Sequence, residues 1–226
     1  MGRLIVIDGL DGSGKGTHSK RVTEWLNDHG IPAMRISFPD YESPSSALLQ
    51  MYLKGDFGAH ASDVNAYAAS MFFAADRFAG FRTKYQKPYD EGVILVADRY
   101  TTSNIVHQMS KLPQEEWDSF IEWLSDFEYH KLELPRPDGV IYLDMLPEIS
   151  QRLIERRYRG DLSKKDIHEL DVDYLKQSRR CALYVAEKLG WRMVPMYDEQ
   201  QVPRSKEENF EIILKQIREV YHDLEF

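Results

Sequence analysis

The sequence is poor in cysteine, with Cys181 as the only thiol among 226 residues. A disulfide framework and a cysteine-based metal site are therefore excluded, and the apolar helical pattern around Cys181 predicts a buried structural thiol. Long apolar runs are missing as well. The run at 4–7 is too short for a signal peptide, and no stretch is long enough to cross a membrane. We expect a cytoplasmic protein that does not bind membranes.

Positive charge is also in deficit, because 29 Lys and Arg face 37 Asp and Glu, which gives a net charge of −8. This balance argues against non-specific binding of nucleic acid, so phosphate recognition has to come from local basic clusters. The length and the 42% hydrophobic content suffice for one domain with a full core. No repeat or linker divides the chain, so we expect a single domain over residues 1–226.

Short apolar or β-branched runs alternate with helical patterns along the whole chain. The expected strands are 3–8, 31–37, 92–97, 139–144 and 191–197. The expected helices are 15–29, 44–54, 62–87, 101–130 in pieces, 147–158, 171–189 and 205–222. This alternation predicts an α/β fold with a parallel sheet covered on both faces. Ligands of such sheets bind at the carboxyl ends of the strands, so the residues just after each strand are the informative ones.

The glycine-rich loop, residues 9–17, follows the first expected strand and precedes a helix. Its glycines let backbone N–H groups point at phosphates, the helix adds a positive N-terminal end, and Lys15 supplies a mobile charge. Gly16 stands where the usual pattern has a Ser or Thr that holds Mg²⁺, and Thr17 comes one position later. We therefore expect the metal to be held largely through water. The expected ATP-binding residues are Gly9, Leu10, Asp11, Gly12, Ser13, Gly14, Lys15, Gly16 and Thr17.

Asp98 and Arg99 directly follow the third expected strand. An acid at the end of a buried strand beside a phosphate loop is positioned to hold Mg²⁺, directly or through water. The guanidinium of Arg99 offers a bidentate fork for a phosphate. The alternative is a structural ion pair that caps the next helix. In that helix Asn104 and Gln108 share a face, with Ser103 and His107 beside them.

Two further clusters carry planar or cationic side chains at helical spacing. Phe73 and Arg77 are four residues apart, so one could stack on a base while the other reaches its carbonyl edge. The alternative is a core aromatic beside a solvated arginine. Arg152, Arg156 and Arg159 also share one helix face and precede a stretch without apolar periodicity, which predicts a cationic lid. The alternative there is a basic helix end that complements its own dipole.

Taken together, these motifs resemble the thymidylate kinase family. The resemblance runs from Arg3 to about Tyr197 through Asp-Gly-Ser-Gly-Lys, Phe-Pro, Phe-x-x-x-Arg, Asp-Arg-Tyr, Tyr-Leu-Asp-x-x-Pro-Glu and the arginine-rich lid. It implies a three-layer α/β/α P-loop kinase fold with a five-stranded parallel sheet and a mobile lid at about 156–170. It also implies a homodimer that transfers the γ-phosphate of ATP to dTMP, giving dTDP, with Mg²⁺.

The resemblance also implies roles for individual residues. Asp11 would take the sugar 3′-hydroxyl, Phe38 would pack near the sugar and base, and Phe73 would stack on thymine. Arg77 would reach O4 of the base, and Arg99 would hold the acceptor phosphate. With Asn104 at the base edge, the expected dTMP-binding set is Asp11, Phe38, Phe73, Arg77, Arg99, Ser103, Asn104, His107 and Gln108. Because the loop carries small residues, the catalytic arginines belong to the lid, and the expected catalytic set is Lys15, Asp98, Arg99, Arg156, Arg157 and Arg159.

Two positions depart from the family pattern. His107 stands where relatives often carry an aromatic that excludes a ribose 2′-hydroxyl, and Tyr41 stands where some have a phosphate-binding arginine. The segment 111–134 has no assignment beyond a dimer surface or a helical insert. Two alternatives to a dTMP kinase therefore stay open. One is a kinase of another pyrimidine nucleotide (UMP, CMP or dUMP) or of a deoxynucleoside, and the other is a non-catalytic nucleotide-binding relative.

Overall fold

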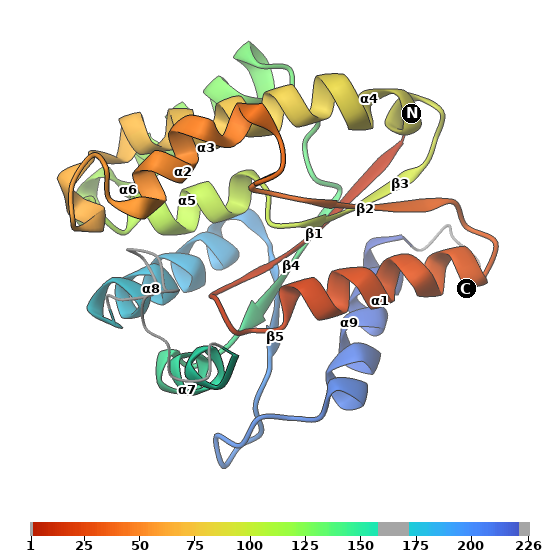
Figure 1. Cartoon of the computed structure of the whole chain (residues 1–226). Helices are drawn as coiled ribbons and strands as arrows, with labels where there is room; N and C mark the ends of the chain where they lie inside the picture. The colour runs from red at the N-terminus through yellow and green to blue at the C-terminus, as the bar shows by residue number, and fades with distance from the viewer. Residues whose placement is uncertain (1, 158–171, 222–226) are drawn as a thin grey trace.

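A computed structural model describes residues 2–157 and 172–221 of the chain. Five parallel strands form one sheet with helices on both of its faces (Figure 1). The strands are β1 (Arg3–Gly9), β2 (Ala33–Ser37), β3 (Ile94–Asp98), β4 (Gly139–Asp144) and β5 (Arg192–Pro195). The α-helices are α1 (Lys15–Asp28), α2 (Ala47–Lys54), α3 (Ala66–Gly80), α4 (Gln86–Asp90), α5 (Thr101–Met109), α6 (Trp117–Ser125), α7 (Pro147–Arg157), α8 (Val172–Leu189) and α9 (Lys206–Val220).

The strand order β2-β3-β1-β4-β5 places the first strand at the centre of the sheet. Ile7 of β1 and Ser37 of β2 both lie opposite Asp98 of β3, so these three strands end side by side. The residues that follow them therefore meet at one edge, as the sequence predicts for ligand-binding groups. The expected five-stranded parallel sheet is confirmed.

Alternate residues of the central strands point to opposite faces, and each face has its own core. Leu4 and Val6 pack in the layer formed by α3, α5, α6 and α8. Ile5 and Ile7 pack in the layer formed by α1 and α9 on the other side (Figure 1). Cys181 of α8 is fully buried in the first core, which confirms the expected structural thiol.

The helical pattern expected at 62–87 is interrupted. Asn65 accepts a hydrogen bond from Ala68 N at 2.8 Å and caps α3, so this helix begins at Ala66. After Gly80 the chain continues through a π-helical turn, η3 (Phe81–Tyr85), into α4. Short 3-10 turns also occur at η1 (Pro44–Ser46), η2 (Ala61–Asp63) and η4 (Gln114–Glu116).

The segment without a sequence assignment forms α6 and a second π-helical turn, η5 (Asp126–Lys131). Trp117, Phe120 and Leu124 of α6 are buried in the core beside α5. The segment is therefore part of the fold of this domain. Among the described residues, no helix combines the length and the apolar character that crossing a membrane requires.

Candidate active site

The glycine-rich loop is held in a conformation that only glycine adopts easily. Gly9, Gly12 and Gly14 have φ of 152°, 80° and 92°. A Cβ on Gly9 would lie 2.5 Å from the Leu143 carbonyl oxygen, so the backbone of β4 leaves no room for a side chain at this position. Gly14 precedes α1, and no side chain caps this helix end. Its first N–H groups are therefore available to an anion, as the sequence predicts.

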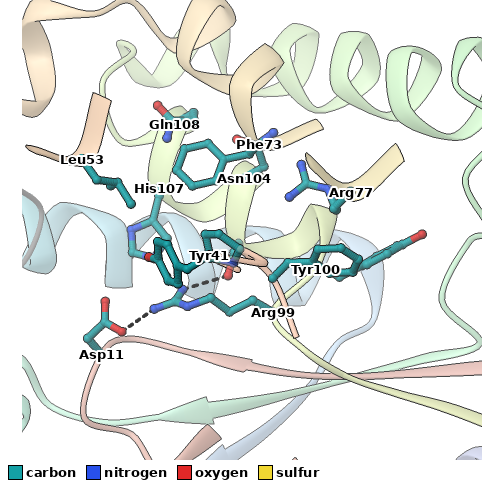
Figure 2. Close-up of a pocket in the computed structure, with 13 residues that line it drawn as sticks. Asp11, Tyr41, Leu53, Phe73, Arg77, Arg99, Tyr100, Asn104, His107 and Gln108 are labelled. Atoms are coloured by element: carbon teal, nitrogen blue, oxygen red, sulfur yellow. Dashed lines mark hydrogen bonds and ion pairs between the residues drawn. The ribbon is translucent and has the colours of Figure 1, made fainter. Parts of the chain in front are cut away.

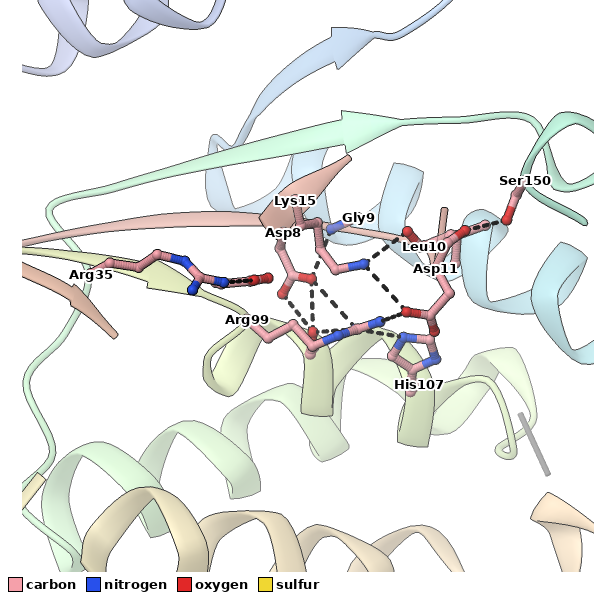
Figure 3. Close-up of polar contacts among 11 residues, drawn as sticks. Asp8, Gly9, Leu10, Asp11, Lys15, Arg35, Arg99, His107 and Ser150 are labelled. Atoms are coloured by element: carbon pink, nitrogen blue, oxygen red, sulfur yellow. Dashed lines mark hydrogen bonds and ion pairs between the residues drawn. The ribbon is translucent and has the colours of Figure 1, made fainter. Parts of the chain in front are cut away.

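Lys15 and Asp11 face each other within this loop. Lys15 Nζ donates to the Leu10 carbonyl at 2.9 Å and lies 3.5 Å from Asp11 Oδ1. Burial, together with the nearby charge of Arg99, lowers the pKa of Lys15. Ser150 of α7 donates to the Asp11 carbonyl and fastens the loop to that helix (Figure 3).

Arg99 links the glycine-rich loop to α5. Its backbone is in the left-handed region, with φ of 67°, which is uncommon for a residue with a side chain. Its Nη2 donates to Asp11 Oδ1 at 2.5 Å, and its Nη1 donates to Ser103 Oγ at 2.9 Å and lies 3.2 Å from His107 Nε2 (Figure 3). The guanidinium is thereby fixed between loop and helix.

The charges around Asp11 keep it ionised. Burial acts to raise the pKa of Asp11, but Arg99, Lys15 and His107 together hold this pKa well below its usual range. Burial likewise acts to lower the pKa of Arg99, and the carboxylates of Asp11 and Asp8 outweigh it and raise that pKa. The junction therefore carries a fixed carboxylate beside a fixed cation.

Asp8, near the end of β1, binds residues on both sides of the same junction. It is 1% exposed and accepts hydrogen bonds from Gly9 N at 2.8 Å, from Ser103 Oγ at 2.7 Å and from Thr102 Oγ1. The Ser103 hydroxyl, which the sequence assigns to ligand binding, is thus bound to Asp8 and Arg99. These bonds help to hold Arg99 in place, and the expected contact of Ser103 with dTMP stays a prediction.

Asp98, the expected metal residue, is paired with an arginine that the sequence analysis missed. Arg35 of β2 donates from Nη2 to Asp98 Oδ2 at 2.6 Å and from Nε to Ser19 Oγ at 2.9 Å. A Cβ on Gly16 would lie 3.2 Å from Asp98 Oδ2, so glycine leaves room for this pair. Residues 2–157 and 172–221 contain no group of three or more His, Cys, Asp or Glu arranged to hold a metal. A carboxylate oxygen is a ligand that suits Mg²⁺, so Asp98 fits such an ion chemically, and the expected metal role of Asp98 stays a prediction.

A pocket opens between α3 and α5 and ends at Asp11 and Arg99; we call it the α3–α5 pocket (Figure 2). Phe73 and Arg77 both face it, as their helical spacing predicts. Figure 2 shows a charged end at Asp11 and Arg99 and an aromatic and amide end at Phe73, Asn104 and Gln108. The structure brings together every residue of the expected dTMP-binding set: Asp11, Phe38, Phe73, Arg77, Arg99, Ser103, Asn104, His107 and Gln108. Four more line it: Pro39, Tyr41, Leu53 and Tyr100.

Amide atoms that lack partners lie at the aromatic end. Asn104 Oδ1 and both amide atoms of Gln108 are buried and have no hydrogen-bond partner among the described residues. Buried polar atoms without partners are costly, on the order of 1–3 kcal/mol each. Because both residues line the pocket, a ligand with polar edges would satisfy them.

A buried acid holds the loop that forms one wall of the pocket. Asp76 of α3, 1% exposed, accepts from Asp40 N at 2.8 Å and from Ser45 Oγ at 2.6 Å. These bonds fix the segment 38–45, which includes Phe38. Asp76 belongs to no sequence motif, although an acid on the buried face of a helix signals such an anchor.

Comparison with known proteins decides the family. The family model described as thymidylate kinase matches residues 7–209 of the chain. The chain belongs to the thymidylate kinase family. The thymidylate kinase of Mycobacterium tuberculosis (strain ATCC 25618 / H37Rv) is 29% identical over 193 residues, which are 83% of this chain and 87% of that protein.

Two eukaryotic thymidylate kinases extend the comparison. The Caenorhabditis elegans protein is 30% identical over 161 residues, and this match spans 66% of this chain and 66% of that protein. The solved structure of thymidylate kinase from Candida albicans superimposes with a TM-score of 0.69 at 23% identity, covering 98% of this chain and 91% of that one. This likeness shows that the fold is that of a thymidylate kinase.

The lid arginines cannot be placed with the other thymidylate kinase candidates. Arg156 and Arg157 belong to the last turn of α7, but their side chains lie outside the described residues, as does Arg159. Arg152, on the same helix, is exposed and donates from Nε to the Glu148 carbonyl at 3.3 Å. The expected catalytic roles of the three lid arginines stay predictions.

Proposed function

We propose that this chain transfers the γ-phosphoryl group of ATP to dTMP and produces dTDP. The observation that carries the proposal is the Arg99–Asp11 pair, which lies where the glycine-rich loop meets the α3–α5 pocket. A nucleotide on the loop and a monophosphate in the pocket would bring their phosphates together there. Family membership supports the same reaction.

The reaction requires mainly positioning and charge neutralisation. The N–H groups of the loop and Lys15 bind the donor phosphates, while Arg99 binds the acceptor phosphate and holds it in line. Asp98 would hold Mg²⁺, which would supply positive charge beside the transferred group. The lid arginines Arg156, Arg157 and Arg159 are proposed to add positive charge at the same point.

The acceptor would lie along the pocket with its base at the aromatic end. Phe73 stacks on the base, and Arg77 and Asn104 contact its polar edge. The second oxygen of Asp11, Oδ2, has no hydrogen-bond partner among the described residues, so it can accept from the sugar 3′-hydroxyl. His107, beside Arg99, limits the space at the sugar and disfavours a ribose 2′-hydroxyl.

A coupled ADP-release assay with ATP, Mg²⁺ and an acceptor panel tests the proposal. The panel contains dTMP, dUMP, UMP, CMP, AMP and thymidine, and we expect turnover to favour dTMP strongly. Equal use of UMP would replace the proposal with a broader pyrimidine monophosphate kinase. This alternative matters because the Candida albicans relative is described as having broad substrate specificity. ATP binding without turnover of any acceptor would favour a non-catalytic relative.

We also propose that the chain acts in the cytoplasm as a homodimer. Tyr67, Met71 and Phe78 are 37%, 55% and 39% exposed and form one apolar stripe along α3. Such a stripe is suited to a self-complementary interface. Light scattering should give twice the monomer mass, and Met71→Asp should halve it. A monomeric wild-type protein at assay concentration would contradict the dimer.

A further inference from the structure

Glu128 is a buried acid in the segment to which the sequence analysis assigned no role. It lies in η5 and is 0% exposed, beside the aromatic and aliphatic core formed by α6 and its neighbours. A buried carboxylate is costly unless it is paired and hydrogen-bonded. The hydrogen-bond partners of Glu128 therefore indicate its role in the structure.

Each carboxylate oxygen of Glu128 accepts two hydrogen bonds. Oε2 accepts from Arg77 Nε at 2.6 Å and from Thr101 Oγ1 at 2.8 Å. Oε1 accepts from Arg77 Nη2 and from Asn104 Nδ2 at 3.0 Å. One acid thus connects η5 with α3 and α5, and two of its three partners line the α3–α5 pocket.

These bonds determine which atom of Arg77 is left for a ligand. Nε and Nη2 form one edge of the guanidinium, and Glu128 binds both. Nη1 lies on the far side and has no hydrogen-bond partner in the described part of the chain. The side chains of the pair are 2% and 0% exposed, so the guanidinium is a rigid donor.

The amide of Asn104 is fixed in the same way. Nδ2 donates to the Glu128 carboxylate and to the Ser70 carbonyl at 3.1 Å. Both groups are acceptors only, so the amide cannot be turned around without losing two hydrogen bonds. Asn104 Oδ1 is therefore the free end, and it is buried without a partner among the described residues.

We propose that Glu128 sets the base specificity of the pocket by presenting Arg77 Nη1 as a donor beside Asn104 Oδ1 as an acceptor. The inference rests on the proposed function. Thymine and uracil match this order, because O4 accepts and N3–H donates. Cytosine has the reverse order, since N4 donates and N3 accepts. It would place N4–H against the donor of Arg77 and N3 against the acceptor of Asn104, and neither contact could form a hydrogen bond. Glu128 is a positioning residue, because it binds the two groups that contact the base.

The test compares dTMP with dCMP in the wild-type enzyme and in Glu128→Gln. The substituted amide is uncharged and can donate as well as accept, so Arg77 and Asn104 lose their fixed orientations. We expect the KM for dTMP to rise about tenfold or more, with kcat within about threefold and the KM for ATP unchanged. We also expect the kcat/KM ratio of dTMP over dCMP to fall about tenfold.

Two control variants separate positioning from general stability. Glu219→Gln removes the charge that pairs with Arg192, which donates to Glu219 Oε2 at 2.7 Å on the opposite side of the sheet. Ile217→Ala opens a cavity in the core beneath α9 and lowers stability far from the pocket. Both should keep the wild-type ratio of dTMP over dCMP.

The outcomes distinguish this inference from the proposed function. A wild-type enzyme that does not phosphorylate dTMP overturns the proposed function. An active wild type with a folded Glu128→Gln variant of unchanged KM and unchanged ratio overturns the inference alone. If Glu128→Gln does not fold, Glu128→Asp keeps the charge but withdraws the carboxylate. Its ratio should fall about threefold, and a wild-type ratio would overturn the inference.

Discussion

The glycine-rich loop and the α3–α5 pocket share Asp11, yet they are built in different ways. The loop is contiguous in sequence, and its conformation follows from glycines at positive φ and a helix end that no side chain caps. The pocket is assembled from α3, α5 and the segment after β2, and one buried acid from η5 orients its polar groups. A site made of backbone groups is sensitive to substitutions within the loop itself. The specificity of a site made of side chains can instead be changed by a substitution at one residue that is distant in sequence.

The largest effect is expected at Arg99, where the two regions meet. Arg99→Ala removes the proposed acceptor clamp and the partner of Asp11, and we expect turnover to fall by about 10³-fold or more. ATP binding should persist, because the backbone of the loop is unchanged. Single-turnover kinetics and binding of a fluorescent ATP analogue measure the two separately. Arg192→Ala is the matched control, and normal turnover in Arg99→Ala would refute the assignment.

The next largest effect tests whether the loop depends on its backbone. Gly9→Ala places a Cβ 2.5 Å from the Leu143 carbonyl at φ of 152°, so we expect a loss of about 1–3 kcal/mol in the free energy of unfolding. ATP affinity should fall as well, because the loop has to shift. Gly30→Ala also has a positive φ, 77°, but open space around its Cβ, so stability should fall by about 1 kcal/mol without loss of ATP affinity. Equal ATP affinities in the two variants would contradict the backbone argument.

A smaller effect is expected for the ring that faces the pocket. Phe73→Ala should raise the KM for dTMP about 10- to 100-fold, since stacking on a base contributes about 1–3 kcal/mol. The KM for ATP should not change. Phe72→Ala is a close control, because its ring packs on Tyr52 and Phe57 and does not line the pocket. Similar changes in KM for dTMP in both variants would mean that α3 has been disturbed as a whole.

The smallest effect concerns stability near the pocket. Lys111 Nζ donates to Tyr52 Oη at 3.0 Å and to the Val64 carbonyl at 2.9 Å, and burial lowers its pKa to about 7. The unfolded chain keeps this proton up to the ordinary pKa of 10.5, so the folded state bears the full cost of the buried charge below pH 7, and this cost decreases as pH rises from about 7 towards 10.5. The free energy of unfolding should rise from pH 7 to 9 by less than about 1.4 kcal/mol per pH unit.

Urea titrations at several pH values measure this slope. Lys111→Met should flatten the slope, whereas replacing the exposed Lys54 by Met should leave it as in the wild type. An unchanged slope in Lys111→Met would show that another group titrates.

The sequence predicts one region far better than the other for a physical reason. The glycine-rich loop, the strands and the residues just after them are set by local patterns, so the sheet and the position of Asp98 and Arg99 could be predicted. Spacing on one helix likewise brought Phe73 and Arg77 together. Arg35 and Glu128 depend on partners 63 and 51 residues away in sequence, so no local motif reports what they bind.

A usable signal for Glu128 was nevertheless present. Trp117, Ile121 and Leu124 repeat at helical spacing and are buried, and Glu128 continues the same face. A charged residue on the apolar face of a helix predicts a buried ion pair, because an unpaired charge there would be too costly. The sequence cannot identify the partner, which depends on how η5 packs against α3 and α5.

The buried Cys181 has a practical consequence for following the enzyme at work. Its side chain is 0% exposed, and burial raises the pKa of its thiol to about 12. Maleimide and iodoacetamide reagents attack thiolates, so the native chain should resist labelling while folded. A cysteine introduced at Tyr41, which is 54% exposed at the rim of the pocket, would then carry a fluorophore at one defined site. Acceptor binding could be followed in real time without first removing the natural cysteine.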